Sequence, residues 1–216
     1  MNVPSALNDR HQELFYLLRR RISLLEYPPG FRLSEAEIAE EFSLSRTPVR
    51  RVIAELQSQG LVSSVHGVGT MVTEFDGAQL QQIWQLRLQL VSTVLALGVT
   101  QVDHGIKAQF QALLGQAEAV LGQADQRRFA ELNIAFYEAM ATLCANQPLR
   151  KMLDALFYQS HRLWLHGLSS SLEAESLAFF HDIQTIERRI AEGDGRTALM
   201  LWQAAISAVI ARHKLV

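Results

Sequence analysis

The sequence predicts a mainly α-helical protein with two domains: an N-terminal winged helix-turn-helix of three helices and a β-hairpin, then an all-α antiparallel bundle of about six helices. Three observations predict this fold class. Residues 33–60 have the pattern of two short helices joined by a tight turn, and residues 61–73 that of a small hairpin. Everything after about residue 79 follows a helical period. We place the boundary between the domains at residue 75, which gives domains 1–75 and 76–216.

The amino-acid composition limits the classes of protein to which the chain can belong. The chain has 216 residues, of which 49% are hydrophobic and 19% charged, so it can bury two modest cores. Its single cysteine, Cys144, excludes an internal disulfide and is expected to be a buried apolar residue. No secretory signal and no run of roughly eighteen apolar residues is present, so we expect a cytoplasmic protein that does not enter membranes.

The first expected helix covers residues 8–26, after a frayed start at residues 1–7. Its apolar residues recur at helical spacing, and Tyr27-Pro28-Pro29-Gly30 stops it. The Arg19-Arg20-Arg21 run could touch DNA backbone, but we favour a solvated helix face for it. The helix is expected to pack behind the helix-turn-helix.

Two further helices follow at close spacing. Ser34 and Glu37 have the spacing of a capping box, and Ile38, Ala39 and Phe42 form the inner face of the helix that they begin. Ser45 is the expected cap of the next helix, residues 46–59, which Gly60 ends. Four apolar residues of this helix fall at i, i+3, i+4 and i+7 and predict a buried stripe: Val49, Val52, Ile53 and Leu56.

The other face of residues 46–59 is basic. Arg46, Thr47, Arg50 and Arg51 lie in its N-terminal half, and the helix contains no acidic residue before Glu55. Arginine can bond the O6 and N7 atoms of guanine with two parallel hydrogen bonds, and helix N-termini favour phosphate. This pattern is typical of a recognition helix that enters the major groove.

The expected hairpin pairs residues 62–65 with residues 70–73. Between them lie His66, Gly67 and Gly69, and glycine permits positive φ and a close approach of the backbone to DNA. The hairpin therefore predicts the wing of a winged helix.

These motifs, in this order and spacing, resemble the GntR family of bacterial transcriptional regulators. The resemblance implies base contacts from Arg46 and Arg50, contacts from Ser45 and Thr47 to phosphates or base edges, and wing contacts from His66 and Gly67. We add Arg51 and Gly69 to the expected DNA-binding set. A winged helix can also serve as a protein-interaction module, but the intact arginines favour DNA. The motifs are Pro28-Pro29-Gly30, Arg32-Leu33-Ser34-Glu35, Ile38-Ala39-Glu40, Leu44-Ser45-Arg46-Thr47-Pro48-Val49-Arg50, Leu56, Gly60-Leu61-Val62 and Gly67-Val68-Gly69-Thr70.

The second half predicts long helices with short connections, which favours an antiparallel bundle. Arg87 lies in the middle of the apolar face of the first of them. Asp125 is the expected cap of the third, and Ser169-Ser170-Ser171 is a polar turn. The expected helices are residues 78–98, 103–121, 126–145, 147–168, 172–192 and 196–214.

This half resembles the FCD domain, the effector-binding and dimerisation bundle of FadR-like regulators. Arg87 matches its early arginine, residues 136 and 146–149 match its Phe-His…Asn-Pro-x-Leu segment, and residues 186–194 match the end of its penultimate helix. The resemblance implies four metal-ligand positions, and these hold Asn133, Tyr137, Ile183 and Ala205. A phenol, an isoleucine and an alanine in place of three imidazoles remove most donors, so we expect no metal and no cofactor.

The histidines do not restore such a site in the sequence pattern. His181 lies two residues from the expected position, which is about 200° around a helix. His161, His166 and His213 lie on other segments without a pairing pattern, and we interpret them as ordinary surface or satisfied histidines.

A metal-free pocket is the remaining expectation. Asn133 and Tyr137 share a helix face and are expected beside Arg87, whose partner is either a ligand carboxylate or an internal acid. Two alternatives stay open for Trp164 and Trp202: they line a wall of this pocket, or they belong to the hydrophobic core of the bundle. The loss of metal ligands favours an effector that is an organic acid or an apolar metabolite, or none. The expected effector-binding residues are Arg87, Asn133, Tyr137, Ile183, Trp202 and Ala205.

We therefore expect a sequence-specific DNA-binding transcriptional regulator, and a repressor rather than an activator. A homodimer would read a pseudo-palindromic double-stranded operator, with its affinity modulated by a small-molecule effector. The alternative is a constitutive DNA-binding protein whose helical domain only dimerises. The chain shows no nucleophile with a partnered base and no phosphate loop, so we do not expect an enzyme.

Overall fold

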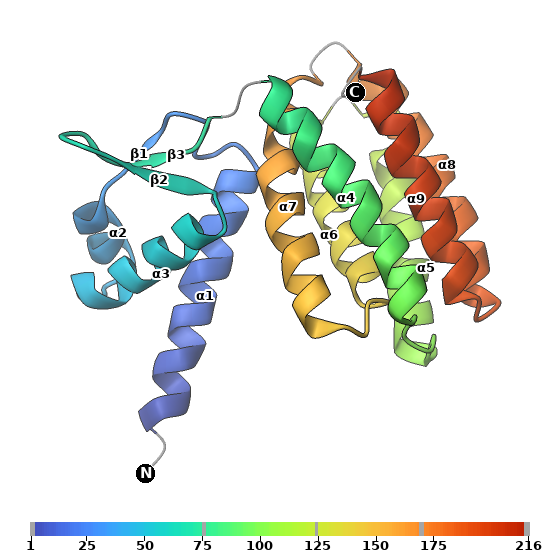
Figure 1. The fold of residues 1–216 in the computed structure, drawn as a ribbon, viewed down its shortest axis with the longest axis horizontal. Coiled ribbons are helices and arrows are strands. Elements are labelled where there is room, and N and C mark those ends of the chain that lie inside the picture. Colours follow the sequence, from blue (N-terminus) through green and yellow to red (C-terminus); the bar gives the residue numbers. More distant parts are fainter. Residues whose placement is uncertain (1–2, 75–76, 124, 169–170, 214–216) are drawn as a thin grey trace. The chain divides into compact units, whose positions relative to one another are not determined.

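The computed structural model describes residues 3–74, 77–123, 125–168 and 171–213, with side chains from residue 10 onward. The chain divides into two compact units, Met1–Phe75 and Asp76–Val216, called here the N-terminal and C-terminal units. The predicted fold class is confirmed: a winged helix-turn-helix precedes an all-α bundle (Figure 1). Two predicted connections, Phe75-Asp76 and Ser169-Ser170, lie outside the described residues.

The N-terminal unit contains three helices and a small antiparallel sheet. Its strands lie in the order β1-β3-β2, and β2 and β3 form the predicted hairpin, with Val62 opposite Val72. Strand β1 pairs with β3 and was not predicted, because two residues are too few to show an alternating pattern. The elements are α1 (Val3–Ser23), β1 (Arg32–Leu33), α2 (Glu35–Glu41), α3 (Arg46–Ser58), β2 (Val62–Val65) and β3 (Gly69–Val72).

Helix α1 begins earlier and ends earlier than predicted. The expectation of a frayed start was wrong for residues 3–7, and residues 1–2 lie outside the described part. Pro4 falls in the first turn, where its missing N–H costs nothing, so it does not prevent helix formation. The helix ends at Ser23, and Leu25 adopts a left-handed conformation with φ of 61°.

The core of the N-terminal unit joins α1, α3 and the sheet. The predicted stripe of α3 is buried, and Leu18 and Ile22 of α1 are fully buried. His11 of α1 also contacts Glu55 of α3, with Nε2 and Oε2 2.9 Å apart. These contacts fix α3 with its apolar face inward, so its basic face is turned to solvent.

The C-terminal unit contains six helices in its described residues, each close to a predicted range. Helix α5 packs against α6 and α8, α8 against α9, and α4 against both α7 and α9 (Figure 1). The helices are α4 (Gly77–Leu97), α5 (His104–Val120), α6 (Gln126–Ala141), α7 (Gln147–His166), α8 (Leu172–Ala191) and α9 (Gly195–Arg212).

Side-chain caps begin four of these helices. Asp103, Asp125, Asn146 and Asp194 each accept a hydrogen bond from the backbone N–H three residues further on. The cap at Asp125 confirms the prediction. Helix α6 stops four residues before its predicted end, and beyond it the carbonyl of Leu143 accepts a hydrogen bond from the N–H of Thr100.

Two further predictions concern the burial of Cys144 and the presence of membrane-spanning helices. Cys144 is buried, as predicted for an apolar role. Among the described residues, no helix combines the length and apolar content that crossing a bilayer requires.

Candidate functional site

The outward face of α3 carries the basic residues that the sequence pattern grouped. Arg46, Thr47, Arg50 and Arg51 are exposed on the side opposite the buried stripe. Ser45 is the N-cap residue by position, but its hydroxyl makes no capping hydrogen bond, so it also remains exposed. Three guanidinium groups and two hydroxyls thus lie at the N-terminal half of one exposed helix.

Arg50 has an acidic neighbour that the sequence pattern did not reveal. The Nε of Arg50 donates to Oε2 of Glu35 over 2.7 Å, and Glu35 is the first residue of α2. Helix α3 has no acidic residue before Glu55, as predicted, but α2 supplies one from 15 positions earlier. No signal within α3 could have indicated this pair.

The arginines of α1 differ from the expected solvated face. Arg19 is buried, with its guanidinium over the rings of Phe15 and Tyr16. Arg21 bonds the carboxylate of Glu41 and the hydroxyl of Tyr27. Arg21 therefore holds α1 to α2 and to the segment after α1, whereas the ring contacts of Arg19 lie within α1 and Arg20 is exposed.

The wing ends in an exposed turn between β2 and β3. His66 and Gly67 lie exposed in this turn, and Gly69 is exposed where β3 begins; the two glycines have φ of 75° and 116°. Residues other than glycine rarely adopt these φ angles, so the backbone here favours glycine at both positions. The backbone of the tip is thereby accessible to a partner.

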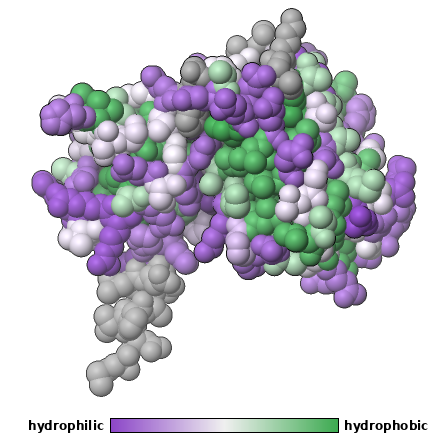
Figure 2. All heavy atoms as spheres, in the orientation of Figure 1, coloured by the Kyte–Doolittle hydropathy of each residue, from purple (hydrophilic) through white to green (hydrophobic). Residues whose placement is uncertain are grey.

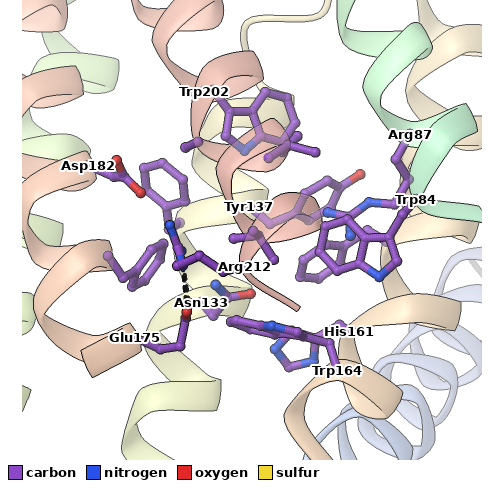
Figure 3. A pocket seen from close by; sticks show the side chains of 16 residues that line it. Trp84, Arg87, Asn133, Tyr137, His161, Trp164, Glu175, Asp182, Trp202 and Arg212 are labelled. Carbon is purple, nitrogen blue, oxygen red and sulfur yellow. Dashed lines mark hydrogen bonds and ion pairs between the residues drawn. The ribbon is translucent and has the colours of Figure 1, made fainter. Parts of the chain in front are cut away.

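A cavity lies inside the C-terminal unit, lined by α4, α6, α7, α8 and α9 (Figure 3). Five of the six residues expected to bind an effector line it: Arg87, Asn133, Tyr137, Trp202 and Ala205. Ile183 does not, because its side chain is fully buried in the core. On α8 the cavity is lined instead by Glu175, Phe179 and Asp182, at i, i+4 and i+7.

Arg87 is the buried cation of this cavity. Its Nη1 donates to the hydroxyl of Ser160 over 2.9 Å, and its guanidinium lies 4.2 Å from the ring centre of Trp84 and 5.2 Å from that of Phe157. Among the described residues it forms no ion pair with a carboxylate. The internal acid that we considered is therefore not its partner, and burial lowers its pKa to about 10.

Two tryptophans add further donors to the lining. Trp84 and Trp164 are buried, with ring centres 6.4 Å apart, and the indole N–H of each lacks a hydrogen-bond acceptor in the described part of the chain. Buried N–H groups normally have a partner, because leaving one without costs the energy of its lost hydration. Arg87 and these two indoles thus form a group of hydrogen-bond donors on the part of the lining that α4 and α7 supply.

Tyr137 faces the cavity with its ring and not with its hydroxyl. The ring stacks on Phe157 with centres 3.7 Å apart, and the hydroxyl donates to Oδ1 of Asp154 over 2.6 Å. Burial and the neighbouring Asp154 carboxylate raise the pKa of Tyr137 well above its ordinary value. The phenol therefore stays neutral, and its hydroxyl already has a hydrogen-bond acceptor in Asp154.

The acidic side of the cavity belongs to α8. Buried Glu175 accepts from Arg212 Nε at 2.7 Å and from Arg212 Nη2 at 3.0 Å (Figure 3). His213 Nε2 also lies 3.0 Å from Oε1 of Glu175. Burial acts to raise the pKa of Glu175, but Arg212 and His213 outweigh it, so the pKa is lowered. Asp182 has no such partner among the described residues, and burial raises its pKa to about 6.

The histidines take positions that only partly follow the expectation. His166 and His181 are exposed, but His161 is buried and lines the cavity, which sequence reasoning missed. The missed signal was its place on the apolar stripe of α7 between Phe157 and Trp164. Within the described residues, no group of three or more His, Cys, Asp or Glu side chains is arranged to hold a metal ion.

Comparison with known proteins gives two adjoining family matches. Residues 10–72 match the bacterial regulatory proteins of the gntR family, and residues 82–208 match the FCD domain. An uncharacterized HTH-type transcriptional regulator of Agrobacterium vitis, from the TAR-I ttuE-ttuC' intergenic region, is 30% identical over 150 residues, or 68% of this chain and 85% of that protein. The HTH-type transcriptional repressor RspR of Escherichia coli K12 is 25% identical over 170 residues, or 74% of this chain and 75% of RspR.

Solved structures share the fold. Escherichia coli McbR/YncC superposes with a TM-score of 0.78 at 22% identity, covering 93% of this chain and 95% of that one. A GntR transcriptional regulator of Rhodococcus sp. RHA1 gives a TM-score of 0.72 at 20% identity, covering 94% and 97%.

A winged helix with a basic outward face, followed by a helical bundle that contains a cavity, is the architecture of a two-part transcription regulator, and the family matches assign the chain to that class of protein. The chain belongs to the GntR family of bacterial transcriptional regulators, and its C-terminal unit is an FCD domain.

Proposed function

We propose that this regulator is a homodimeric repressor whose operator affinity is set by a small molecule bound in a metal-free cavity of the FCD domain. The observation that carries the proposal is buried Arg87, which faces the cavity without a carboxylate partner among the described residues. The relative named a transcriptional repressor supports the sign of regulation. Acting on DNA, the protein works in the cytoplasm.

Operator binding is assigned to domain 1–75. Arg46 and Arg50 read base edges in the major groove, Ser45, Thr47 and Arg51 contact phosphates or base edges, and the wing tip at His66, Gly67 and Gly69 approaches the minor groove. The exposure of all these residues and their place on α3 and the β2–β3 turn support this assignment.

Dimerisation is assigned to domain 76–216. Leu86 and Leu97 of α4 are 44% and 59% exposed, and Met200 of α9 is 53% exposed. Figure 2 shows hydrophobic residues gathered on the face of this unit that α4 crosses. Such an exposed apolar area is a usual mark of a protein interface, and a two-fold pair of winged helices would read a pseudo-palindrome.

The effector is proposed to be a small organic acid with an apolar body. Its oxygen atoms would accept from Arg87 and from the indole N–H groups of Trp84 and Trp164, which lack acceptors in the described structure. The aromatic lining would hold the apolar part. The centres of water molecules can occupy about 60 Å³ of the cavity, so the proposed effector is small.

Thermal unfolding of the full-length protein tests this proposal. We expect a chelator to leave the melting temperature unchanged, and an aliphatic or aromatic carboxylate to raise it by binding the folded state. The same compound should change the affinity for operator DNA.

Two results would contradict parts of the proposal. Strong stabilisation by zinc, nickel or manganese, reversed by the chelator, would show that the cavity is not metal-free. If no compound changes either the melting temperature or the operator affinity, the alternative holds, in which the helical domain only dimerises.

A further inference from the structure

The ion pair between Glu35 and Arg50 concerns the recognition helix directly. Arg50 Nε donates to Glu35 Oε2 at 2.7 Å, while the side chain of Arg50 remains 66% exposed. No described residue accepts from the two terminal amino groups of Arg50. The carboxylate thus holds the guanidinium at its inner edge and leaves the outer edge open.

This geometry matters because a guanidinium can present two different donor edges. One edge consists of Nε with one terminal nitrogen, and the other consists of the two terminal nitrogens. Glu35 occupies Nε, so only the outer edge of Arg50 is available for guanine O6 and N7. An arginine held this way also has fewer orientations in which it can reach a phosphate.

The location of Glu35 keeps this partner in place. Glu35 is the first residue of α2, and the positive end of a helix favours a carboxylate. Helices α2 and α3 pack against each other, and the buried stripe of α3 sets the direction in which Arg50 points. The pair is exposed and adds little to folding stability, so its effect is expected in binding and not in unfolding.

We propose that Glu35 is a positioning residue that makes Arg50 selective for a base and prevents it from acting as a general phosphate contact. This inference rests on the proposed operator binding by α3. Glu35 would lower the affinity for bulk DNA through its charge and raise the preference for one base pair in each half-site.

Selection from random-sequence duplex DNA with the full-length protein tests the inference. Three variants are compared with the wild type: Glu35→Gln, Glu37→Gln and Arg50→Lys. Glu37→Gln is the matched control because Glu37 lies on the same exposed first turn of α2 and its side chain contacts no described residue through a hydrogen bond or ion pair. The measurements are base preference at each position, affinity for a mixed-sequence duplex at several salt concentrations, and melting temperature.

We expect Glu35→Gln to reduce the base preference about tenfold at one position per half-site, because the two-bond contact to guanine is no longer aligned. Its binding to mixed-sequence DNA should become tighter and more salt-dependent, with a slope steeper by about one unit than that of Glu37→Gln. Arg50→Lys should lose the same base preference, because lysine lacks the two-donor edge.

Three outcomes would overturn the inference. If Glu35→Gln keeps the base preferences of Glu37→Gln, Glu35 does not position Arg50. If Arg50→Lys folds normally and keeps wild-type base preferences, the two-donor edge of Arg50 does not read the position. If the wild type shows no base preference at all, the proposed operator binding by α3 is wrong as well. The first two outcomes, in contrast, contradict only the role of Glu35 and Arg50.

Discussion

Arg87 Nη1 donates to Ser160 Oγ over 2.9 Å inside the C-terminal unit, and the same hydroxyl donates back to the carbonyl of Leu156 in its own helix. A buried cation is therefore compensated by one hydroxyl and by the faces of Trp84 and Phe157. This is a weak compensation compared with a carboxylate. An anionic ligand would therefore compensate the buried charge of Arg87 better than its present neighbours do.

Replacing Arg87 by Met should separate folding from ligand response. Because the variant removes a buried charge but keeps the apolar contacts, we expect its unfolding free energy to stay equal or to rise by up to about 2 kcal/mol. Stabilisation by carboxylates should disappear. Arg188→Met, at an exposed position of α8, controls for the lost charge. A loss of more than about 2 kcal/mol in denaturant unfolding would mean that Arg87 is needed for folding.

Glu175→Gln should loosen the connection between the start of α8 and the end of α9. We expect a loss of about 1 to 3 kcal/mol at pH 7, because Arg212 and His213 lose a buried carboxylate partner. The lowered pKa of Glu175 means that its contribution is present above its unfolded pKa near pH 4 and is lost as the pH falls further. Urea unfolding at pH 7 and below pH 4 measures this, with exposed Glu173→Gln as control. An equal difference at both pH values would contradict it.

Asp182→Asn should have the opposite dependence on pH. The pKa of Asp182 is raised to about 6 by burial, so the folded state binds more protons than the unfolded state between about pH 4 and 6. Wild-type stability should therefore fall as the pH rises through this window. We expect the variant to be more stable than the wild type at pH 7 by about 1 kcal/mol, allowing for partial exposure. The advantage should vanish below pH 4, and a constant advantage across pH would argue against it.

Arg46→Ala should weaken operator binding by roughly 1 to 3 kcal/mol and relax base preference in each half-site. The cause is the loss of a guanidinium on the exposed face of α3, while the buried stripe is unchanged. Binding to a duplex selected by the wild type measures the effect, with Arg188→Ala as the charge control. If Arg46→Ala and Arg50→Ala both bind like the wild type, α3 is not the recognition helix.

Most of the secondary structure could be predicted because its signals are local. The buried stripe from Val49 to Leu56 and the cap at Asp125 depend on spacings of three or four residues, which a helix converts directly into one face or one hydrogen bond. The hairpin likewise follows from two short β-prone segments that flank a turn with Gly67 and Gly69. Strand β1 was missed because its pairing with β3 joins positions nearly forty residues apart.

The candidate sites show where local spacing stops being informative. It grouped Arg46, Thr47, Arg50 and Arg51 on one helix face and Asn133 with Tyr137 on another, whereas the expectation that this pair lies beside Arg87 came from the resemblance to the FCD domain. It could not assign Glu35 to Arg50, His161 to the cavity, or Ser160 to Arg87 across 73 positions.

The residues of α8 give the clearest physical reason for this limit. By helical spacing Glu175, Phe179 and Asp182 share the face centred on Glu175, whereas Ile183, one turn after Phe179, lies at the edge towards the neighbouring face. Which of these faces meets the cavity depends on how α8 rotates against α5 and α9, and that rotation is set by packing with helices distant in the sequence. The chain therefore encodes the helices and their faces locally, whereas the composition of the cavity arises from the assembly of the whole bundle.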